Sequence, residues 1–507
     1  MNNRRLVPRR LPGARRHLTV LSLFAAVALT ACSGAAAQPG QPSGGVGGVG
    51  GVGGVGGSTA ATAPRVETAV ARLAPAATTV PNRTRIGSQP LLAATDWPAY
   101  HRNASRTGDD PAFPAPGKLS KAWAAGLDGA VYGQPIVVGG TIFAATENDS
   151  VYALNPADGS VKWKQHLGTP VALSSLPCGN IDPLGITSTP AYDHETNSIF
   201  VSAELKGPRH SLFALNPATG AVKWSRGLDL TGSDATPLQQ RGALAIGNGY
   251  VYIGFGGLAG DCGNYVGRVV AIPTNDVGSR RAYVVPAQRE AGIWSTGGPV
   301  LDSSSNVYVS VGNGSSTTTY DGSDSVLKLS ATMHLKSRFA PSRWRTDNAN
   351  DQDLGSMTPV LVPHGLVFIV GKSGVAYVLR QSALGGIGGQ VSSKAICDAF
   401  GASAQVGSVV FVPCTSGIRK VTIGSTGKIT LGWRTSSGAV GPPVVGSGTV
   451  WSLDYWGGQL YALSLTNGAV RAHISVGNLP HFASPTLWNK LVLVGTMSGV
   501  VAVRVAP

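Results

Sequence analysis

The sequence of 507 residues lacks most of the short motifs that would assign a chemistry to it. It contains no CxxC or CxxCH motif, which removes the usual support for a structural zinc site or a c-type haem. Its histidines form no HxH or HExxH pair, so we do not expect metal ligation by the isolated histidines His166, His194, His364 and His481. The GKSG segment at Lys372 does not complete the glycine pattern of a phosphate-binding loop, and we interpret it as a β-turn.

Charge is also scarce. Only 13% of the residues are charged, with 40 Lys and Arg against 25 Asp and Glu, and six of the arginines lie between Arg4 and Arg16. The rest of the chain contains no block of basic residues, so we expect no nucleic-acid partner. A mildly basic surface is compatible with an anionic envelope polymer or a membrane surface.

Residues 1–31 have the pattern of an export signal. The apolar run Leu18 to Leu29 follows the arginines and is too short to span a membrane. The sequence LTAC that ends at Cys32 resembles the lipobox of bacterial lipoproteins, in which the cysteine carries the lipid. The alternatives are an ordinary cleaved signal with an incidental Cys32, and twin-arginine export through Arg15 and Arg16. We expect a lipid-anchored protein on the cell membrane that faces the periplasm or the extracellular side.

Residues 32–95 are predicted not to fold on their own. They include the tract GGVGGVGGVGGVGG from Gly44 to Gly57 and then a segment rich in Ala, Thr and Pro. Few large apolar residues are present to form a core. The glycine tract contains no proline, which excludes a collagen-like repeat. We interpret this region as a flexible tether between the lipid anchor and a folded domain.

The folded domain is built from a repeated unit, of which Tyr132 to Trp163 is one complete copy. A second copy runs from Ser188 to Trp224, and its ending ALNPATGAVKW matches ALNPADGSVKW of the first at nine of eleven positions. Short β-branched and apolar runs separated by turn residues predict four strands in each copy. In the first copy the predicted strands are Gln134 to Val138, Thr141 to Thr146, Ser150 to Leu154 and Ser160 to Lys164.

Eight copies are present. A proline opens six of them, and residues 241–255 and 401–413 are two further copies without it; the six prolines are Pro135, Pro190, Pro299, Pro359, Pro443 and Pro485. The last copy stops after three strands, and the segment Leu119 to Leu127 before the first copy supplies the missing fourth. We therefore predict that residues 96–507 form an all-β, eight-bladed β-propeller closed by exchange of this N-terminal strand.

Five tryptophans fall in or near the fourth strands, where a large ring can pack between neighbouring blades. They are Trp123, Trp163, Trp224, Trp344 and Trp433. The unit that ends AL(N/D)xxxGxxxW resembles the repeat of pyrroloquinoline-quinone (PQQ) enzymes. That repeat is shared by quinoprotein alcohol dehydrogenases and by the propeller lipoprotein of the outer-membrane β-barrel assembly machinery. The segment DWPAYHRNASRTG, Asp96 to Gly108, is similar to the one that precedes such propellers, and the middle third resembles polyvinyl-alcohol dehydrogenases.

The resemblance implies the fold, whereas the activity depends on the residues at one mouth of the channel. We expect that mouth to be ringed by the residues that precede each innermost strand, namely Tyr132, Thr187, Arg241, Trp294, Asp353, Phe400, Val440 and Phe482. In a dehydrogenase, Trp294 would stack on PQQ, Arg241 would bind a carboxylate or quinone oxygen, and Asp353 would act as the base. Otherwise these residues line a wet funnel, with Arg241 and Asp353 neutralising each other.

Two further features weigh against a quinone enzyme. The chain has no pair of adjacent cysteines and no haem motif, both of which many relatives have, so any electrons would need an external acceptor. The acidic stretch Asp347 to Asp353 does not match the spacing of an EF-hand. We interpret it as a solvated loop and expect no metal site.

The four cysteines beyond Cys32 are even in number and predict two disulfides in an exported protein, Cys397 with Cys414 and Cys178 with Cys262. The preferred function is a monomeric, non-catalytic scaffold without a cofactor. It would bind envelope proteins or polymers through its funnel loops and blade edges. The alternative is a dehydrogenase that uses PQQ with calcium to oxidise an alcohol or polyol.

Overall fold

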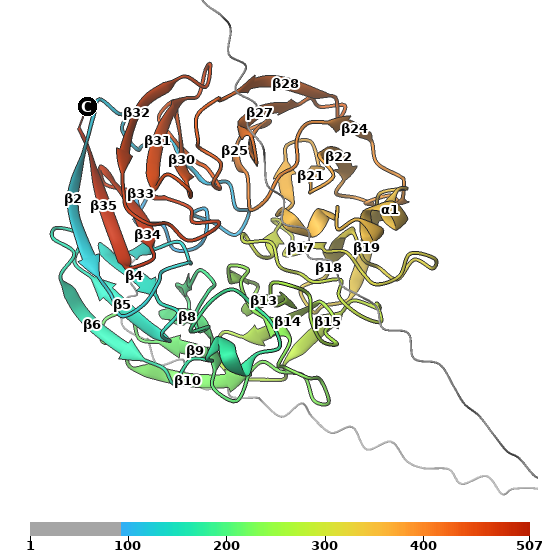
Figure 1. The fold of residues 1–507 in the computed structure, drawn as a ribbon, viewed down its shortest axis with the longest axis horizontal. Coiled ribbons are helices and arrows are strands. Elements are labelled where there is room, and N and C mark those ends of the chain that lie inside the picture. The colour runs from blue at the N-terminus through green and yellow to red at the C-terminus, as the bar shows by residue number, and fades with distance from the viewer. Residues whose placement is uncertain (1–92, 507) are drawn as a thin grey trace, which may run out of the picture. The chain divides into compact units, whose positions relative to one another are not determined.

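The computed structural model describes residues 93–506, which form eight β-sheets around a central axis (Figure 1). Each sheet is one blade, and consecutive strands of the chain run from its inner to its outer edge. The eight-bladed propeller predicted from the repeats is therefore confirmed. The predicted signal peptide, Cys32 and nearly all of the predicted tether lie outside the described residues.

The strands of the first four blades are as follows. Blade 1 contains β3 (Ile136–Val138), β4 (Thr141–Ala145), β5 (Ser150–Leu154) and β6 (Val161–His166). Blade 2 contains β7 (Ala191–Asp193), β8 (Ser198–Leu205), β9 (Arg209–Leu215) and β10 (Val222–Gly227). Blade 3 contains β11 (Leu238–Gln239), β12 (Ala245–Gly247), β13 (Tyr250–Gly257), β14 (Arg268–Pro273) and β15 (Arg281–Val284). Blade 4 contains β16 (Val300–Leu301), β17 (Val307–Val311), β18 (Ser325–Leu329), β19 (Leu335–Ala340) and β23 (Gly386–Ile387).

The other four blades complete the ring. Blade 5 contains β20 (Val360–Val362), β21 (Leu366–Val370), β22 (Val375–Arg380) and β24 (Ser392–Ala395). Blade 6 contains β25 (Ala404–Val406), β26 (Val409–Cys414), β27 (Gly417–Ile423) and β28 (Ile429–Arg434). Blade 7 contains β1 (Asp109–Asp110), β29 (Val444–Gly446), β30 (Thr449–Asp454), β31 (Gln459–Ser464) and β32 (Val470–Ser475). Blade 8 contains β33 (Thr486–Trp488), β34 (Leu491–Thr496), β35 (Gly499–Ala506) and β2 (Lys118–Gly126).

Burial follows the position of a strand in its blade. Every residue of β5 is buried, as in a strand that has a neighbouring blade on each face, and its sequence SVYAL is correspondingly apolar. The outermost strands β6 and β10 alternate between exposed and partly buried residues. This period of two marks a strand with one face in water. The inner strands therefore provide the core, and the fourth strands form the circumference.

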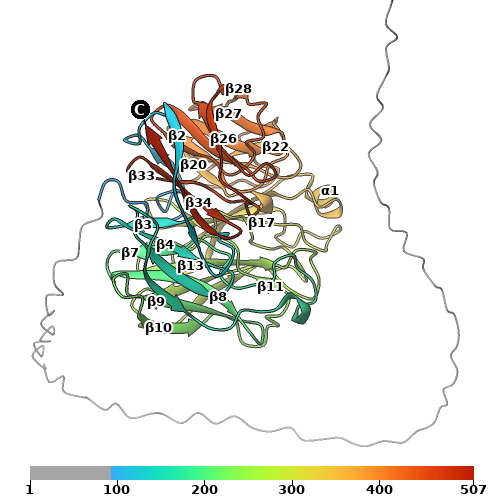
Figure 2. The same ribbon diagram turned by 60° about the vertical axis from the view of Figure 1, so that its left-hand side comes forward.

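The ring closes where β2 pairs antiparallel with β35. In this register Trp123 lies opposite Ala502, and Lys118 lies opposite Ala506. Figure 2 shows β2 beside the strands of the C-terminal blade. The N-terminal strand thus completes the blade of the C-terminal strands, as the sequence predicts. Both strands of this closure have a partner, so β35 does not present an unpaired edge.

The fourth-strand tryptophans dock onto the next blade in a repeated geometry. The indole Nε1 of Trp123 donates to the carbonyl of Pro156 at 2.9 Å, and that of Trp163 donates to the carbonyl of Pro217 at 3.1 Å. In each case a glycine with φ of +75° lies under the ring, Gly159 in the first copy and Gly220 in the second. A Cβ atom at either glycine would lie 2.6 Å from the indole. Trp433 makes the same contacts with the carbonyl of Leu465 and with Gly468.

Trp344 departs from this pattern, because it lies in the short helix α1 (Trp344–Ala349) and not in a fourth strand. Strand β19 ends at Ala340, and the following residue Pro341 has no N–H group with which to continue it. The Trp344 ring is fully buried and packs edge-on against Tyr320, 5.2 Å between centroids. None of the helices in residues 93–506 is long and apolar enough to span a membrane.

The leading segment, residues 96–110, crosses one end of the channel, and its backbone forms hydrogen bonds with five blades. Its backbone exchanges hydrogen bonds with Val137 of blade 1 and accepts one from the N–H of Tyr192 in blade 2. It also accepts hydrogen bonds from the backbone N–H groups of Leu301, Gln405 and Val445, in blades 4, 6 and 7. All five partners lie in innermost strands. The segment therefore closes the channel below the loops that lead into those strands.

Candidate functional site

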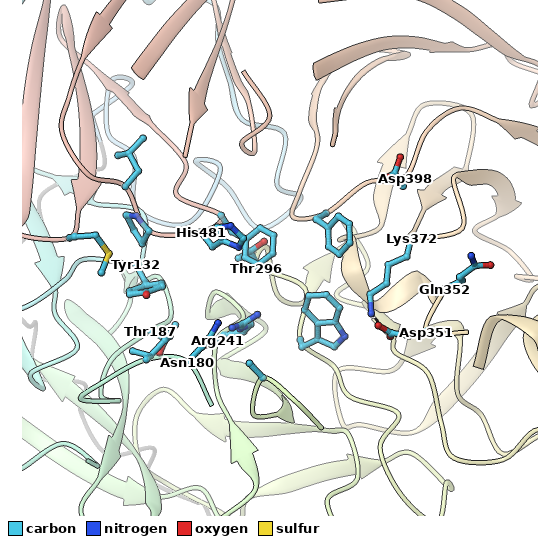
Figure 3. Close-up of a pocket in the computed structure, with 18 of the residues that line it drawn as sticks. Tyr132, Asn180, Thr187, Arg241, Thr296, Asp351, Gln352, Lys372, Asp398 and His481 are labelled. Atoms are coloured by element: carbon cyan, nitrogen blue, oxygen red, sulfur yellow. Dashed lines mark hydrogen bonds and ion pairs between the residues drawn. The ribbon is translucent and has the colours of Figure 1, made fainter. Parts of the chain in front are cut away.

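A cavity of about 810 Å³ lies among the loops that lead into the innermost strands (Figure 3). Such a volume is typical of ligand-binding sites. Six of the eight residues that the sequence places at the channel mouth line this cavity, namely Tyr132, Thr187, Arg241, Trp294, Phe400 and Phe482. Figure 3 shows Tyr132, Thr187 and Arg241 grouped on one side and Lys372 with Asp351 on the other.

The other two predicted residues lie elsewhere. Val440 lines an adjoining pocket of about 270 Å³. Asp353 does not line the cavity; it is fully buried, and its Oδ2 lies 3.0 Å from the Nζ of Lys372. The expectation that Arg241 and Asp353 neutralise each other is therefore wrong, because Lys372 is the counter-ion of Asp353.

Lys372 is a cavity residue that the sequence analysis missed. It does lie in a turn, between β21 and β22, but its side chain reaches both Asp353 and the exposed Asp351. Burial lowers the pKa of Lys372, but Asp353 and Asp351 outweigh this effect and raise it. The ammonium group is thus charged and already paired with two carboxylates. Its Nζ also lies 5.3 Å from the centroid of the Trp294 ring.

Arg241 is the second cation of the cavity, and its environment differs. The guanidinium carbon lies 6.0 Å from the centroid of Trp294 and 5.8 Å from that of Phe482, distances typical of cation–π contacts. Within residues 93–506, no hydrogen bond or ion pair to this guanidinium is formed. Two aromatic rings therefore position the group, while its N–H donors remain free for a ligand.

A buried carboxyl cluster lies behind Arg241, between blades 1 and 2. Burial raises the pKa of Glu147 to about 8, and the same effect with the nearby Glu147 and Glu204 raises that of Asp149 to about 9. Both groups are protonated at neutral pH. The carboxyl of Glu147 accepts a hydrogen bond from Gly185 N–H at 2.8 Å, and at neutral pH it does not neutralise Arg241.

A buried histidine, also missed in the sequence, completes this cluster. The Nδ1 atom of His210 lies 2.8 Å from Asp229, and its Nε2 atom lies 3.2 Å from Glu204. Burial alone would lower the pKa of His210, but the Glu204 and Asp229 carboxylates raise it to about 9. Glu204 lies in β8, His210 lies in β9 and Asp229 lies in the loop after β10. No local sequence pattern therefore identifies this group of residues.

The interpretation of Asp347 to Asp353 as a solvated loop is wrong for part of the stretch. Three of its seven residues belong to α1, and Asp347, Asn348 and Asp353 are buried, whereas residues 349–351 are exposed. Asp347 pairs with Arg343 at 2.7 Å. Burial raises the pKa of Asp353, although Lys372 opposes the effect. These contacts commit Asp347 and Asp353 to internal packing, whereas Asp351 stays exposed.

The loops on one side of the cavity are held by a disulfide. The structure contains both predicted pairs, Cys178–Cys262 and Cys397–Cys414. The first joins the loop that carries Asn180 and Ile181 to the loop that carries Ala259, and all three residues line the cavity. This cross-link limits how far the two loops can separate.

The residues of the cavity can be compared with what PQQ and calcium would require. The volume and the flat Trp294 ring beside Arg241 suit a planar anion. However, no group of three or more His, Cys, Asp or Glu side chains in the described part of the chain could hold a metal ion. The acidic lining residues are Asp351, which pairs with Lys372, and Asp398, which accepts from Thr415. The donor set therefore does not fit a calcium-bound quinone, and Asp353 is not placed to act as its base.

Comparison with known proteins places this geometry in a family. The model of the family described as outer membrane protein assembly factor BamB matches residues 117–386. No curated protein matches the chain in sequence. Among solved structures, quinohemoprotein alcohol dehydrogenase ADHIIG from Pseudomonas putida HK5 is 15% identical, with a TM-score of 0.66 over 81% of this chain and 80% of that one. BamB from Moraxella catarrhalis is 16% identical, with a TM-score of 0.52 over 77% of this chain and 100% of that one.

At such identities the two solved structures show the fold alone. The family model, in contrast, spans more than half of the chain. The protein therefore belongs to the PQQ-like propeller family that is described as outer membrane protein assembly factor BamB.

Proposed function

We propose that this protein is an exported, monomeric binding scaffold of the cell envelope, anchored by lipid at Cys32 and without a catalytic cofactor. The propeller would face the periplasm or the extracellular side and bind envelope proteins or polymers through its funnel loops and blade edges. The observation that carries the proposal is the burial of Asp353 beneath Lys372. Asp353, the base expected from the sequence, therefore does not line the cavity, while Arg241 and the aromatic residues do.

Family membership supports an interaction role, since the family model is described as outer membrane protein assembly factor BamB. The alternative is a PQQ-dependent dehydrogenase that oxidises an alcohol or polyol and passes its electrons to an external acceptor. One observation favours this alternative, namely the Trp294 ring beside Arg241 in a cavity of about 810 Å³.

Reconstitution separates the two functions. The full chain is incubated with PQQ and calcium, and dye reduction is followed with ethanol, glycerol and polyvinyl alcohol as substrates. We expect no alcohol-dependent reduction and no shift of the thermal unfolding midpoint. Stoichiometric PQQ binding with alcohol-dependent turnover would disprove the scaffold function. A pull-down from envelope extract with the same chain then identifies what the scaffold binds.

A further inference from the structure

The cavity offers one free positive charge. Lys372 is neutralised by Asp351 and Asp353, so it contributes no net attraction for an anion. Arg241 forms no ion pair among the described residues, and the nearby Glu147 carboxyl is protonated at neutral pH because burial raises its pKa to about 8. The Asp261 carboxylate also acts electrostatically on Arg241, but it accepts a hydrogen bond from the hydroxyl of Tyr265 and does not pair with the guanidinium. A guanidinium group held between two rings presents a fixed fork of donors, which suits the two oxygens of one carboxylate.

An apolar pocket of about 270 Å³ adjoins this charge. It is lined by Phe400, Pro413, Thr415, Val440, Tyr455, Trp456, His481 and Phe482. Phe482 lies between the two sites, because its ring contacts the Arg241 guanidinium and also lines the pocket. Burial and the nearby Arg241 both lower the pKa of His481, so this wall is uncharged at neutral pH. The pocket has room for one large apolar side chain.

The two sites thus require a carboxylate and an apolar side chain that are close together in one ligand. A polypeptide carries both on its last residue, and capture of a terminal carboxylate is a recurring mode of peptide recognition. We propose that the cavity binds the C-terminus of a partner protein whose last residue is aromatic or large and aliphatic. The terminal carboxylate binds Arg241, the last side chain fills the apolar pocket, and the preceding residues occupy the larger cavity. This inference rests on the proposed scaffold function and names its partner.

The same charges argue against an acidic polymer. Such a polymer repeats its charge along the chain and needs several free cations, whereas the cavity has one. Two of its lining residues, Asp351 and Asp398, are acidic and would repel further negative groups. The apolar lining beyond Phe482 also offers few hydrogen bonds to hydroxyl groups. A single carboxylate next to an apolar group is the better match.

Peptide binding to the full chain tests this inference. The probe is a fluorescein-labelled decapeptide that ends in Ser-Val-Thr-Phe with a free carboxylate, and fluorescence anisotropy reports binding. The first comparison peptide carries a C-terminal amide, and the second ends in Ser in place of Phe. We expect each change to weaken binding about tenfold or more, because the first removes the charge that Arg241 binds and the second leaves the apolar pocket empty.

Variants of the chain assign the effect to the two sites. Arg241→Gln is expected to weaken binding of the free-carboxylate peptide about tenfold or more and to remove the preference over the amide. Val440→Trp fills the apolar pocket and should remove the preference for Phe over Ser while the preference for the carboxylate is kept. Arg504→Gln, on the exposed outer part of β35, deletes the same charge elsewhere and should leave binding unchanged. Thermal unfolding of each variant verifies that it is folded.

The outcomes distinguish this inference from the proposed function. Equal affinity for the free acid and the amide, or an unchanged affinity in Arg241→Gln, overturns the inference. It is also overturned if polyglutamate or PQQ binds and no peptide does. If envelope proteins are captured equally by the original chain and by Arg241→Gln, the scaffold function stands and the C-terminal site does not. Alcohol-dependent dye reduction with PQQ would overturn both.

Discussion

At the scale of single residues, the pairing of Lys372 with Asp353 determines whether the cavity wall is stable. Asp353 is fully buried, so removing its counter-ion leaves an uncompensated charge in the protein interior. We expect Lys372→Met to lower the free energy of unfolding by about 3 kcal/mol. Adding Asp353→Asn to this variant should recover part of the loss, because the buried carboxylate is then absent. Urea denaturation of the single and double variants measures both effects.

The matched control is Lys162→Met. Lys162 is exposed and donates to the hydroxyl of Thr141, so its loss should change the free energy of unfolding by less than about 0.5 kcal/mol. If Lys372→Met were no more destabilising than Lys162→Met, the ion pair with Asp353 would not be part of the folded structure.

The protonated carboxyl of Glu147 predicts how stability depends on pH. Its pKa in the folded protein is about 8, whereas an unfolded chain has a value of about 4.3. Between these values the folded state binds the proton and the unfolded state does not, so the free energy of unfolding falls as the pH rises. The thermal unfolding midpoint should therefore fall between pH 5 and pH 8. It should fall less in Glu147→Gln, whose amide is neutral throughout.

His210 contributes to the same fall in the free energy of unfolding at higher pH. Its pKa of about 9 lies above the unfolded value of about 6.5, so its stabilising charge is fully present below pH 6.5 and is lost as the pH rises toward 9. Glu147→Gln should consequently flatten the profile without abolishing it. Glu195→Gln, at an exposed turn between β7 and β8, is the control and should follow the original profile. A Glu147→Gln profile parallel to that of the original chain would contradict the protonated state of Glu147.

The position of a residue in the repeat predicts most of the cavity lining but not the burial of Asp353. Tyr132, Thr187, Arg241, Phe400, Val440 and Phe482 each come four residues before an innermost strand, and five of these six line the main cavity. Asp353 comes seven residues before β20, because the short helix η2 (Leu354–Ser356) lies between them. The N–H of Leu354 donates to the buried Asp324, which holds this part of the loop inside the blade. Alignment of the repeats predicts where a residue lies along the chain. It does not predict that this inserted turn leaves the side chain of Asp353 buried and away from the cavity surface.

At the scale of elements, the contact between a tryptophan and the glycine of the next blade explains why the ending of the repeat is visible in the sequence. Gly220 has φ of +75°, and a Cβ atom there would lie 2.6 Å from Trp163. Gly220→Ala therefore combines backbone strain with displacement of the ring, and we expect it to cost about 2 to 3 kcal/mol of stability. Chemical denaturation measures the loss.

Gly249 provides a control with the same backbone conformation. Its φ is +73°, and a Cβ atom there would meet nothing within 4 Å. Gly249→Ala should therefore cost only the backbone term, about 1 kcal/mol. Equal losses in Gly220→Ala and Gly249→Ala would mean that the tryptophan adjusts to the new methyl group without cost. The glycine of the repeat would then be required only by the positive φ of the turn and not by the contact with the tryptophan.

Across the propeller, the fold was predictable because the same four-stranded blade is repeated along the chain. The similarity between the copies predicts the number of blades. The missing fourth strand of the last copy predicts that the N-terminal strand closes the ring. The role of the leading segment could not be predicted in this way, because its backbone partners lie in blades 1, 2, 4, 6 and 7. Hydrogen bonds from one segment to five distant strands leave no local pattern in the sequence. The segment closes one end of the channel, so a ligand would enter through the loops that carry Arg241 and Trp294.

Closure of the ring by β2 and β35 can be tested with an engineered cross-link. Ser120 and Arg504 are exposed and lie opposite each other in this pair of strands. A disulfide in Ser120→Cys with Arg504→Cys would close a loop of several hundred residues and restrict the unfolded chain, which is worth about 2 to 4 kcal/mol in typical cases. We expect the oxidised double variant to unfold about 3 °C or more above its reduced form.

The difference in unfolding temperature between the oxidised and reduced forms also includes the effect of the two natural disulfides, because reduction opens them as well. The original chain and Ser120→Cys alone are therefore measured under both conditions, and the engineered effect is the additional shift of the double variant. Mass spectrometry of tryptic fragments verifies the new cross-link. If the two cysteines do not pair under oxidising conditions, β2 does not lie on β35 in this register. The eighth blade would then lack its fourth strand, and the geometry that brings Tyr132, Arg241 and Phe482 to one cavity would lose its support.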